Sequence, residues 1–119
     1  MKTEDRLHDH VRHIAEIIEN GYKLEKNELD NYDDGQYKEG DILSAYDYLQ
    51  DMLDIEYTLD SQGNFIGALI CVAFGGPSIY INTRHQRVEG YWWGEKSMMT
   101  YYSDPMNIDG FCEDLWGCR

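Results

Sequence analysis

The segment that decides the fold is NFIGALICVAF, residues 64–74, an apolar run near the middle of this 119-residue chain. It has the length of a β-strand and is apolar on both of its alternating faces, as expected for a central strand covered on at least one side by helices. Three runs rich in β-branched and aromatic residues flank it: IEYTLD (55–60), SIYINT (78–83) and RVEGYWW (87–93). The turn signals SQG, GGP and RHQ separate the runs, so the sequence predicts four strands in antiparallel order.

Helical spacing appears on both sides of this block. Apolar residues recur every three or four positions through residues 5–20, and Gly21 follows where a helix commonly ends. A second helix is predicted to begin at Asp41 as its N-cap, with an apolar stripe from Ile42 to Leu53. The tail, residues 107–118, predicts a short terminal helix packed on the sheet.

These patterns together predict a single α+β domain over residues 1–119. It has an antiparallel sheet of about four strands, two N-terminal helices and a short C-terminal helix. Residues 22–40 have no period and are expected to be an irregular connection. Residues 95–106 fit either a fifth strand around MMTYY or a loop.

The charge of the chain is strongly acidic and uneven. The formal net charge is −13; residues 1–60 hold 17 Asp and Glu against 6 Lys and Arg, whereas residues 61–119 hold 6 against 4. Such a surface repels nucleic acid and anionic membranes and attracts a basic partner, although acidity also simply favours solubility. Neither a membrane-length apolar run nor a secretory leader is present, so we expect a cytoplasmic protein with reduced cysteines.

Motifs for metal binding or catalysis are incomplete. The histidines of HDHVRH (8–13) lack the i, i+4 pair that helical zinc sites use. The segment DNYDDGQYKEGD (30–41) matches part of a calcium loop, but Tyr32 and Lys38 occupy ligand positions, so the sequence favours a solvated acidic loop over a calcium site. We find no nucleophile and base in a recognisable context. The sequence therefore predicts a non-enzymatic protein without metal or cofactor.

The acidic half offers a candidate partner-binding surface. On the predicted second helix, Asp47, Asp51 and Asp54 would fall at i, i+4 and i+7, with neighbours about 6 Å apart, a spacing similar to that of successive DNA phosphates. Carboxylates from the preceding connection could extend this row: Asp30, Asp33, Asp34, Glu39 and Asp41. Three tyrosines could stack on or hydrogen-bond to arginine: Tyr32, Tyr37 and Tyr48. This row favours the hypothesis that the surface mimics DNA and binds the basic groove of a partner.

A second candidate surface comes from adjacent tryptophans. Trp92 and Trp93 on one strand would face opposite sides, so that one enters the core while the other lies with Tyr91 on the other face. Exposed aromatic side chains are enriched at protein interfaces, and a covering helix is the alternative. Trp93 is therefore also a candidate partner-binding residue.

The segment AFGGPSIYINTRHQRVEGYWWG (73–94), followed by IDGFCEDLWGC (108–118), resembles small acidic proteins carried by bacterial mobile elements. The resemblance covers about the C-terminal half and implies a setting in which inhibitors of host defence, including anti-restriction and anti-CRISPR proteins, are common. Two hypotheses follow. The first is an inhibitor that occupies the nucleic-acid site of a Cas effector or restriction enzyme by DNA mimicry. The second is a protein–protein interaction or regulatory module that uses an exposed aromatic sheet surface.

Overall fold

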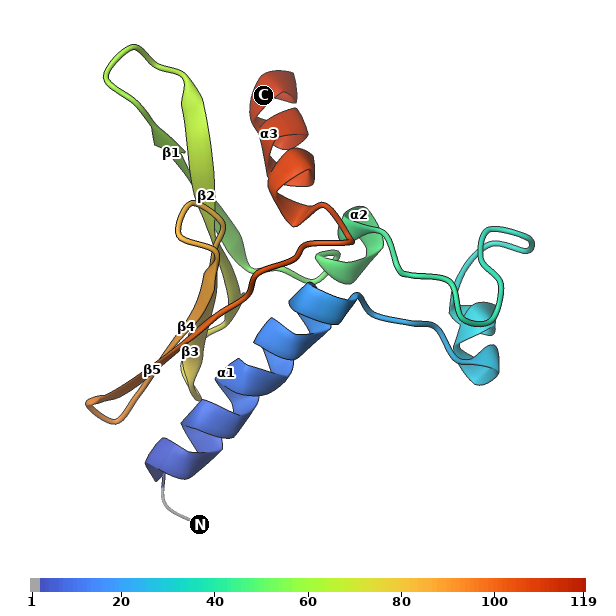
Figure 1. Ribbon diagram of the computed structural model, residues 1–119, viewed down its shortest axis with the longest axis horizontal. Coiled ribbons are helices and arrows are strands. Elements are labelled where there is room, and N and C mark those ends of the chain that lie inside the picture. Colours follow the sequence, from blue (N-terminus) through green and yellow to red (C-terminus); the bar gives the residue numbers. More distant parts are fainter. Residues whose placement is uncertain (1–2) are drawn as a thin grey trace.

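A computed structural model describes residues 3–119 as two layers, an antiparallel sheet with helices packed on one of its faces (Figure 1). The sheet has five strands that pair in chain order, each with the next, so that β1 and β5 form its edges. Their bounds are β1 Asp54–Leu59, β2 Phe65–Ala73, β3 Ser78–Asn82, β4 Arg87–Trp92 and β5 Glu95–Thr100. The α+β class and the antiparallel order predicted from the sequence are confirmed.

The fifth strand resolves the ambiguity left at residues 95–106. The chain reverses between Trp92 and Glu95, which pair directly, through a loop of only two residues, Trp93 and Gly94. Both loop residues have positive φ, 54° and 79°, as a type I′ hairpin requires. A strand count of about four was one short because β5 carries charged and polar residues that hide its period.

The first helix, α1 (Thr3–Asn20), lies across β4 and β5. Its apolar stripe places Leu7, Val11 and Ile18 in the core with almost no exposed surface. Gly21, at φ 82°, follows the helix and donates its amide to the Ile17 carbonyl at 2.7 Å. The predicted first helix and its glycine stop are therefore confirmed.

The C-terminal helix, α3 (Ile108–Cys118), packs on β2 on the same side of the sheet as α1, as predicted (Figure 1). Ile108 and Cys112 are its fully buried contacts with the core. Its N-cap, Asn107, accepts a hydrogen bond from the Gly110 amide at 3.3 Å. No helix among residues 3–119 is both long enough and apolar enough to cross a membrane.

The predicted second helix is wrong in its start and in its length. The helix α2 covers only Ala45–Tyr48, and its N-cap is Ser44, whose hydroxyl accepts the Asp47 amide at 3.2 Å. Asp41 instead accepts the Lys38 amide in a turn. The helix stops early because the Leu53 amide bonds to the Cys71 carbonyl, which commits the following residues to pairing with β2. Tertiary pairing therefore outweighs a helical apolar stripe.

Candidate functional site

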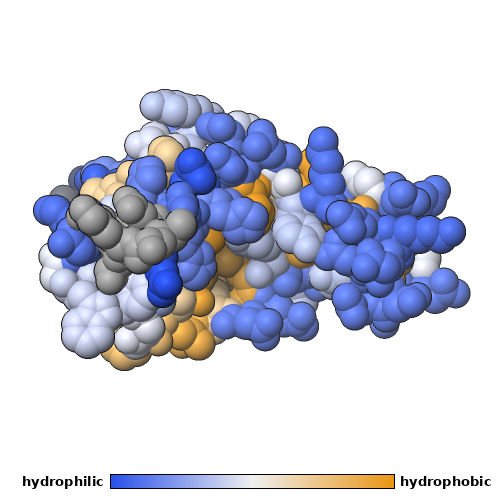
Figure 2. All heavy atoms as spheres, turned by 90° about the horizontal axis from the view of Figure 1, so that it is seen from below, coloured by the Kyte–Doolittle hydropathy of each residue, from blue (hydrophilic) through white to orange (hydrophobic). Residues whose placement is uncertain are grey.

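The most acidic part of the molecule is a projecting loop, residues 25–41, which we call the acidic lobe. It extends away from the sheet beyond α1 and α2 (Figure 1) and contains the 3₁₀ helix η1, Lys26–Asn31. Its 17 residues include seven Asp and Glu and two Lys. Hydrophilic residues cover almost all of the lobe on the face seen in Figure 2. The predicted irregular connection is thus largely this lobe.

Backbone hydrogen bonds close the base of the acidic lobe. The buried Leu24 donates its amide to the Asp41 carbonyl at 2.9 Å and accepts the Gly40 amide at 2.8 Å. Beside it, the Tyr22 hydroxyl donates to the Glu28 carboxylate. This hydrogen bond raises the pKa of Tyr22 to about 12 and lowers that of Glu28. These contacts hold the two ends of the lobe together, so it is a structured projection and not a free loop.

A second set of contacts joins the acidic lobe to α2 through Asp47. The Tyr37 hydroxyl donates to the Asp47 carboxylate, which also accepts from Gln36 Nε2 and Ser44 Oγ, both at 3.2 Å. The Tyr37 hydroxyl oxygen also accepts a hydrogen bond from the Ser44 amide at 3.1 Å. Asp47 is therefore engaged within the protein, where it holds the lobe in place, and is not a free charge for a partner.

The three candidate tyrosines also make contacts inside the protein. The rings of Tyr32 and Tyr37 meet edge to face with centroids 5.0 Å apart, and that of Tyr48 lies 6.4 Å from Tyr22. Burial raises the pKa of Tyr48. All three predicted residues are half-buried, so their rings contribute to the packing of the lobe and its base.

Five candidate carboxylates remain on the surface of the acidic lobe. They are all exposed: Asp30, Asp33, Asp34, Glu39 and Asp41. The ion pairs in the described part of the chain join Arg12 to Asp9 and Glu16, and Arg87 to Glu89. The lobe's carboxylates thus have no cationic partner among residues 3–119, and their charge is available to a basic surface.

The predicted helical row of Asp47, Asp51 and Asp54 is not formed. Asp51 lies in the turn after α2, and Asp54 is the first residue of β1, on the sheet face opposite the helices. The row required a helix through residue 54, and β1 replaces that helix. The phosphate-like spacing derived from helix geometry therefore does not apply to these three residues.

The sheet face opposite the helices is uncovered and carries a polar cluster that the sequence reading did not identify. Glu89, only 7% exposed, accepts hydrogen bonds from Arg87 Nε at 2.6 Å, Asn82 Nδ2 at 2.9 Å and Tyr91 Oη at 3.3 Å. Desolvation acts to raise the pKa of Glu89, but the bonds from Arg87 and Asn82 outweigh it and the pKa is lowered. The sequence could have indicated this cluster, because Arg87, Glu89 and Tyr91 are spaced two apart in RVEGY and so share one face of a strand.

The two tryptophans do not share a strand as predicted. Trp92 ends β4 and packs against the core, whereas Trp93 lies in the following turn with φ 54° and is 82% exposed. Trp93 therefore projects from the hairpin tip and is not on the strand face that carries Tyr91. The expectation that one tryptophan enters the core and the other is exposed is confirmed, with this difference in position.

The arrangement as a whole offers surfaces for binding. In the described part of the chain, no group of three or more His, Cys, Asp or Glu is placed to hold a metal ion. His8 Nδ1 lies 2.9 Å from Ser97 Oγ, a contact on the surface that joins α1 to β5.

Comparisons with protein-family models, with curated proteins and with solved structures find no match to this chain.

Proposed function

We propose that this protein is a non-enzymatic acidic inhibitor that inserts its acidic lobe into the basic nucleic-acid site of a bacterial defence nuclease. The observation that carries the proposal is the lobe itself, a projection with seven carboxylates and two lysines whose exposed acids lack cationic partners among the described residues. A basic groove that normally binds phosphates would form ion pairs with these acids. The mimicry then depends on loop carboxylates and not on a helical row.

The way the lobe is held supports this proposal. Binding by a flexible loop would require its ordering, which costs free energy. Hydrogen bonds at Leu24 and between Tyr37 and Asp47 already fix both ends of the lobe relative to the domain. Part of the ordering cost is thus met by folding, and the carboxylates are presented together at the end of a projection that can enter a groove.

The kind of partner follows from charge and from the resemblance. A net charge of −13 disfavours direct binding of nucleic acid or of an anionic membrane, so we infer a basic protein partner in the cytoplasm. The resemblance of residues 73–94 and 108–118 to proteins of mobile elements supports a Cas effector or a restriction enzyme as that partner.

Competition for DNA tests the proposal directly. A labelled duplex bound to each member of a panel of Cas effectors and restriction enzymes is titrated with the protein at two salt concentrations. We expect displacement of DNA from at least one enzyme, with an affinity that falls steeply as salt rises. Failure to displace DNA from any member of the panel at low salt would count against the defence-nuclease assignment.

Matched variants then locate the contact. Replacement of Asp30, Asp33 and Asp34 by Asn should weaken displacement about a hundredfold, if each lost contact costs about 1 kcal/mol. The control replaces three exposed acids outside the lobe: Glu95 and Glu113 by Gln, and Asp114 by Asn. Equal losses in both variants would mean that net charge alone matters, and no loss in either would exclude the lobe.

A second candidate function is docking through the sheet surface, and exposed apolar side chains favour it. Phe74 is 73% exposed and Trp93 82% exposed, and both lie at the same end of the sheet, beside the turn residues Gly75 and Gly94. In this alternative the protein is an interaction or regulatory module. Variants at Phe74 and Trp93 distinguish the two functions. If these variants still displace DNA, inhibition acts through the lobe and not through this surface.

A further inference from the structure

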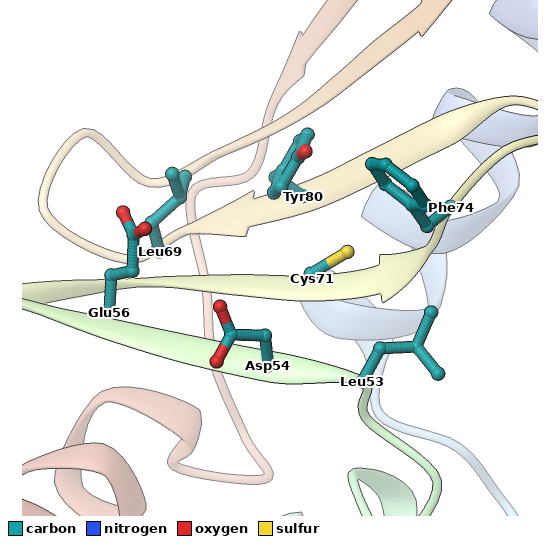
Figure 3. Close-up of a pocket in the computed structure, with 7 residues that line it drawn as sticks. All are labelled: Leu53, Asp54, Glu56, Leu69, Cys71, Phe74 and Tyr80. Atoms are coloured by element: carbon teal, nitrogen blue, oxygen red, sulfur yellow. The ribbon is translucent and has the colours of Figure 1, made fainter.

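The uncovered sheet face contains a groove of about 430 Å³ at the end of β1 and β2, which we call the sheet groove. Its floor is formed by Leu69, Cys71 and Tyr80 from two neighbouring strands (Figure 3). Leu53 and Phe74 line it where the chain enters β1 and leaves β2. In Figure 3 these side chains point to the same side of the sheet, away from the helices.

Strand register explains why these residues share one face. Cys71 pairs with both Asp54 of β1 and Tyr80 of β3, so these three side chains form one row across the sheet. Glu56 pairs with Leu69 in the next row on the same face, two residues along each strand. Ile70, between Leu69 and Cys71, faces the helices and is fully buried. The floor and the two carboxylates are therefore built into the strands, whereas Leu53 and Phe74 lie next to the strand ends.

The groove exposes apolar surface that a partner can cover. Leu53 is 61% exposed and Phe74 is 73% exposed, which is high for large apolar side chains so close together. Their burial by a partner would be favourable because it removes apolar surface from water. An occupant must therefore bring an apolar side chain to contact Leu53, Phe74 and the floor.

Two carboxylates on one side of the groove determine the charge of that occupant. Asp54 and Glu56 are both exposed and lie two residues apart on the same face of β1. The rise of a β-strand places their Cα atoms about 7 Å from each other. Neither has an ion-pair partner in the part of the chain that the structure describes. Arg87 of the same face is already held by Glu89 at 2.6 Å. A cation from a partner would relieve the repulsion between the two acids.

We propose that the sheet groove binds a segment of a partner protein in which Lys or Arg neighbours a large apolar residue. The apolar side chain occupies the floor and the cation lies between Asp54 and Glu56. A second copy of this chain is a poor occupant, because two molecules of net charge −13 would meet with duplicated acids at the contact. This site is independent of the acidic lobe, which lies beyond the helices on the other side of the sheet (Figure 1).

Selection from random short peptides displayed on phage tests the proposal with the whole protein. At physiological salt we expect the selected peptides to share Lys or Arg next to Leu, Met, Phe or Trp. A synthetic peptide of the selected sequence should shift the amide NMR signals of Leu69, Cys71 and Tyr80. Selected peptides without a basic residue, or shifts confined to the acidic lobe, would overturn the proposal.

Three variants assign the two halves of the contact. Asp54→Asn with Glu56→Gln should weaken the selected peptide at least about tenfold, the effect of losing one charge-assisted contact. Leu53→Ser with Phe74→Ser should weaken it to a similar extent at both low and high salt. The matched control, Asp33→Asn with Asp34→Asn, removes the same charge from the lobe and should change affinity less than twofold. A loss as large in this control as in the groove variant would show that only net charge attracts the peptide.

Discussion

The contact between α1 and the sheet depends on a residue without a side chain. A Cβ atom at Gly90 would lie 2.5 Å from Val11 Cγ2 and 2.8 Å from Leu7 Cδ1, both on α1. Carbon atoms in favourable contact are about 3.5–4.0 Å apart. Gly90→Ala therefore requires α1 to move roughly 1 Å away from β4, or its side chains to leave their rotamers. Both responses disturb a region in which Val11 and Val88 have no exposed surface.

The expected magnitude combines two opposing effects. Overpacking of a filled core costs about 1–3 kcal/mol. Replacement of glycine inside a strand by alanine recovers about 0.5–1 kcal/mol of backbone free energy. Gly90→Ala should therefore lower the free energy of unfolding by about 1–2 kcal/mol, and Tm by about 4 °C for each kcal/mol. Equilibrium unfolding in urea, followed by tryptophan fluorescence, measures the change.

A double-mutant cycle distinguishes steric overlap from a general defect. Val11→Ala removes the Cγ2 atom that the new methyl group would meet. Alone, it should cost about 1–3 kcal/mol as a buried deletion, but in the Gly90→Ala background it should cost at least about 1 kcal/mol less. The reasoning is refuted if Gly90→Ala is as stable as the wild type, or if the two effects add within about 0.5 kcal/mol.

Two further predictions concern the turn at Trp93 and the buried thiol of Cys112. Trp93→Asn should raise the free energy of unfolding by about 1 kcal/mol. Trp93 has φ 54° in a two-residue turn, where Asn before Gly94 is preferred. Unchanged or lower stability in urea would contradict this prediction. For Cys112, burial, followed by the charges of Asp109 and Asp104, raises the pKa from 9.0 to about 12. The unfolded chain then loses this proton first, so the stability that the thiol contributes is complete below pH 9 and falls between pH 9 and about 12. The fall in urea-measured stability over that range should be smaller in Cys112→Ala than in the wild type, and identical slopes would disprove the assignment.

Local pattern alone determined most of the sheet and both long helices. The apolar run 64–74 was bound to be an inner strand, because it has no polar face to turn to water, and the period of residues 5–20 could be satisfied only by a helix. The uneven charge was likewise visible at once. The five candidate acids of the lobe, Asp30 through Asp41, could be chosen from sequence because acids in a segment without an apolar period stay in solvent.

Tertiary structure decided which residues come together in the acidic lobe and in the sheet groove. The apolar stripe that follows Asp41 fits a helix by period, but pairing of Asp54–Leu59 with β2 ends α2 at Tyr48 and separates Asp54 from Asp47. Asp47 became a structural anchor only because folding brings Tyr37 against it. The sheet groove joins residues from 53 to 80 through strand register, a long-range property that no local period encodes. Sequence thus specified which residues are apolar or charged, and the pairing of distant strands decided which of them share a surface.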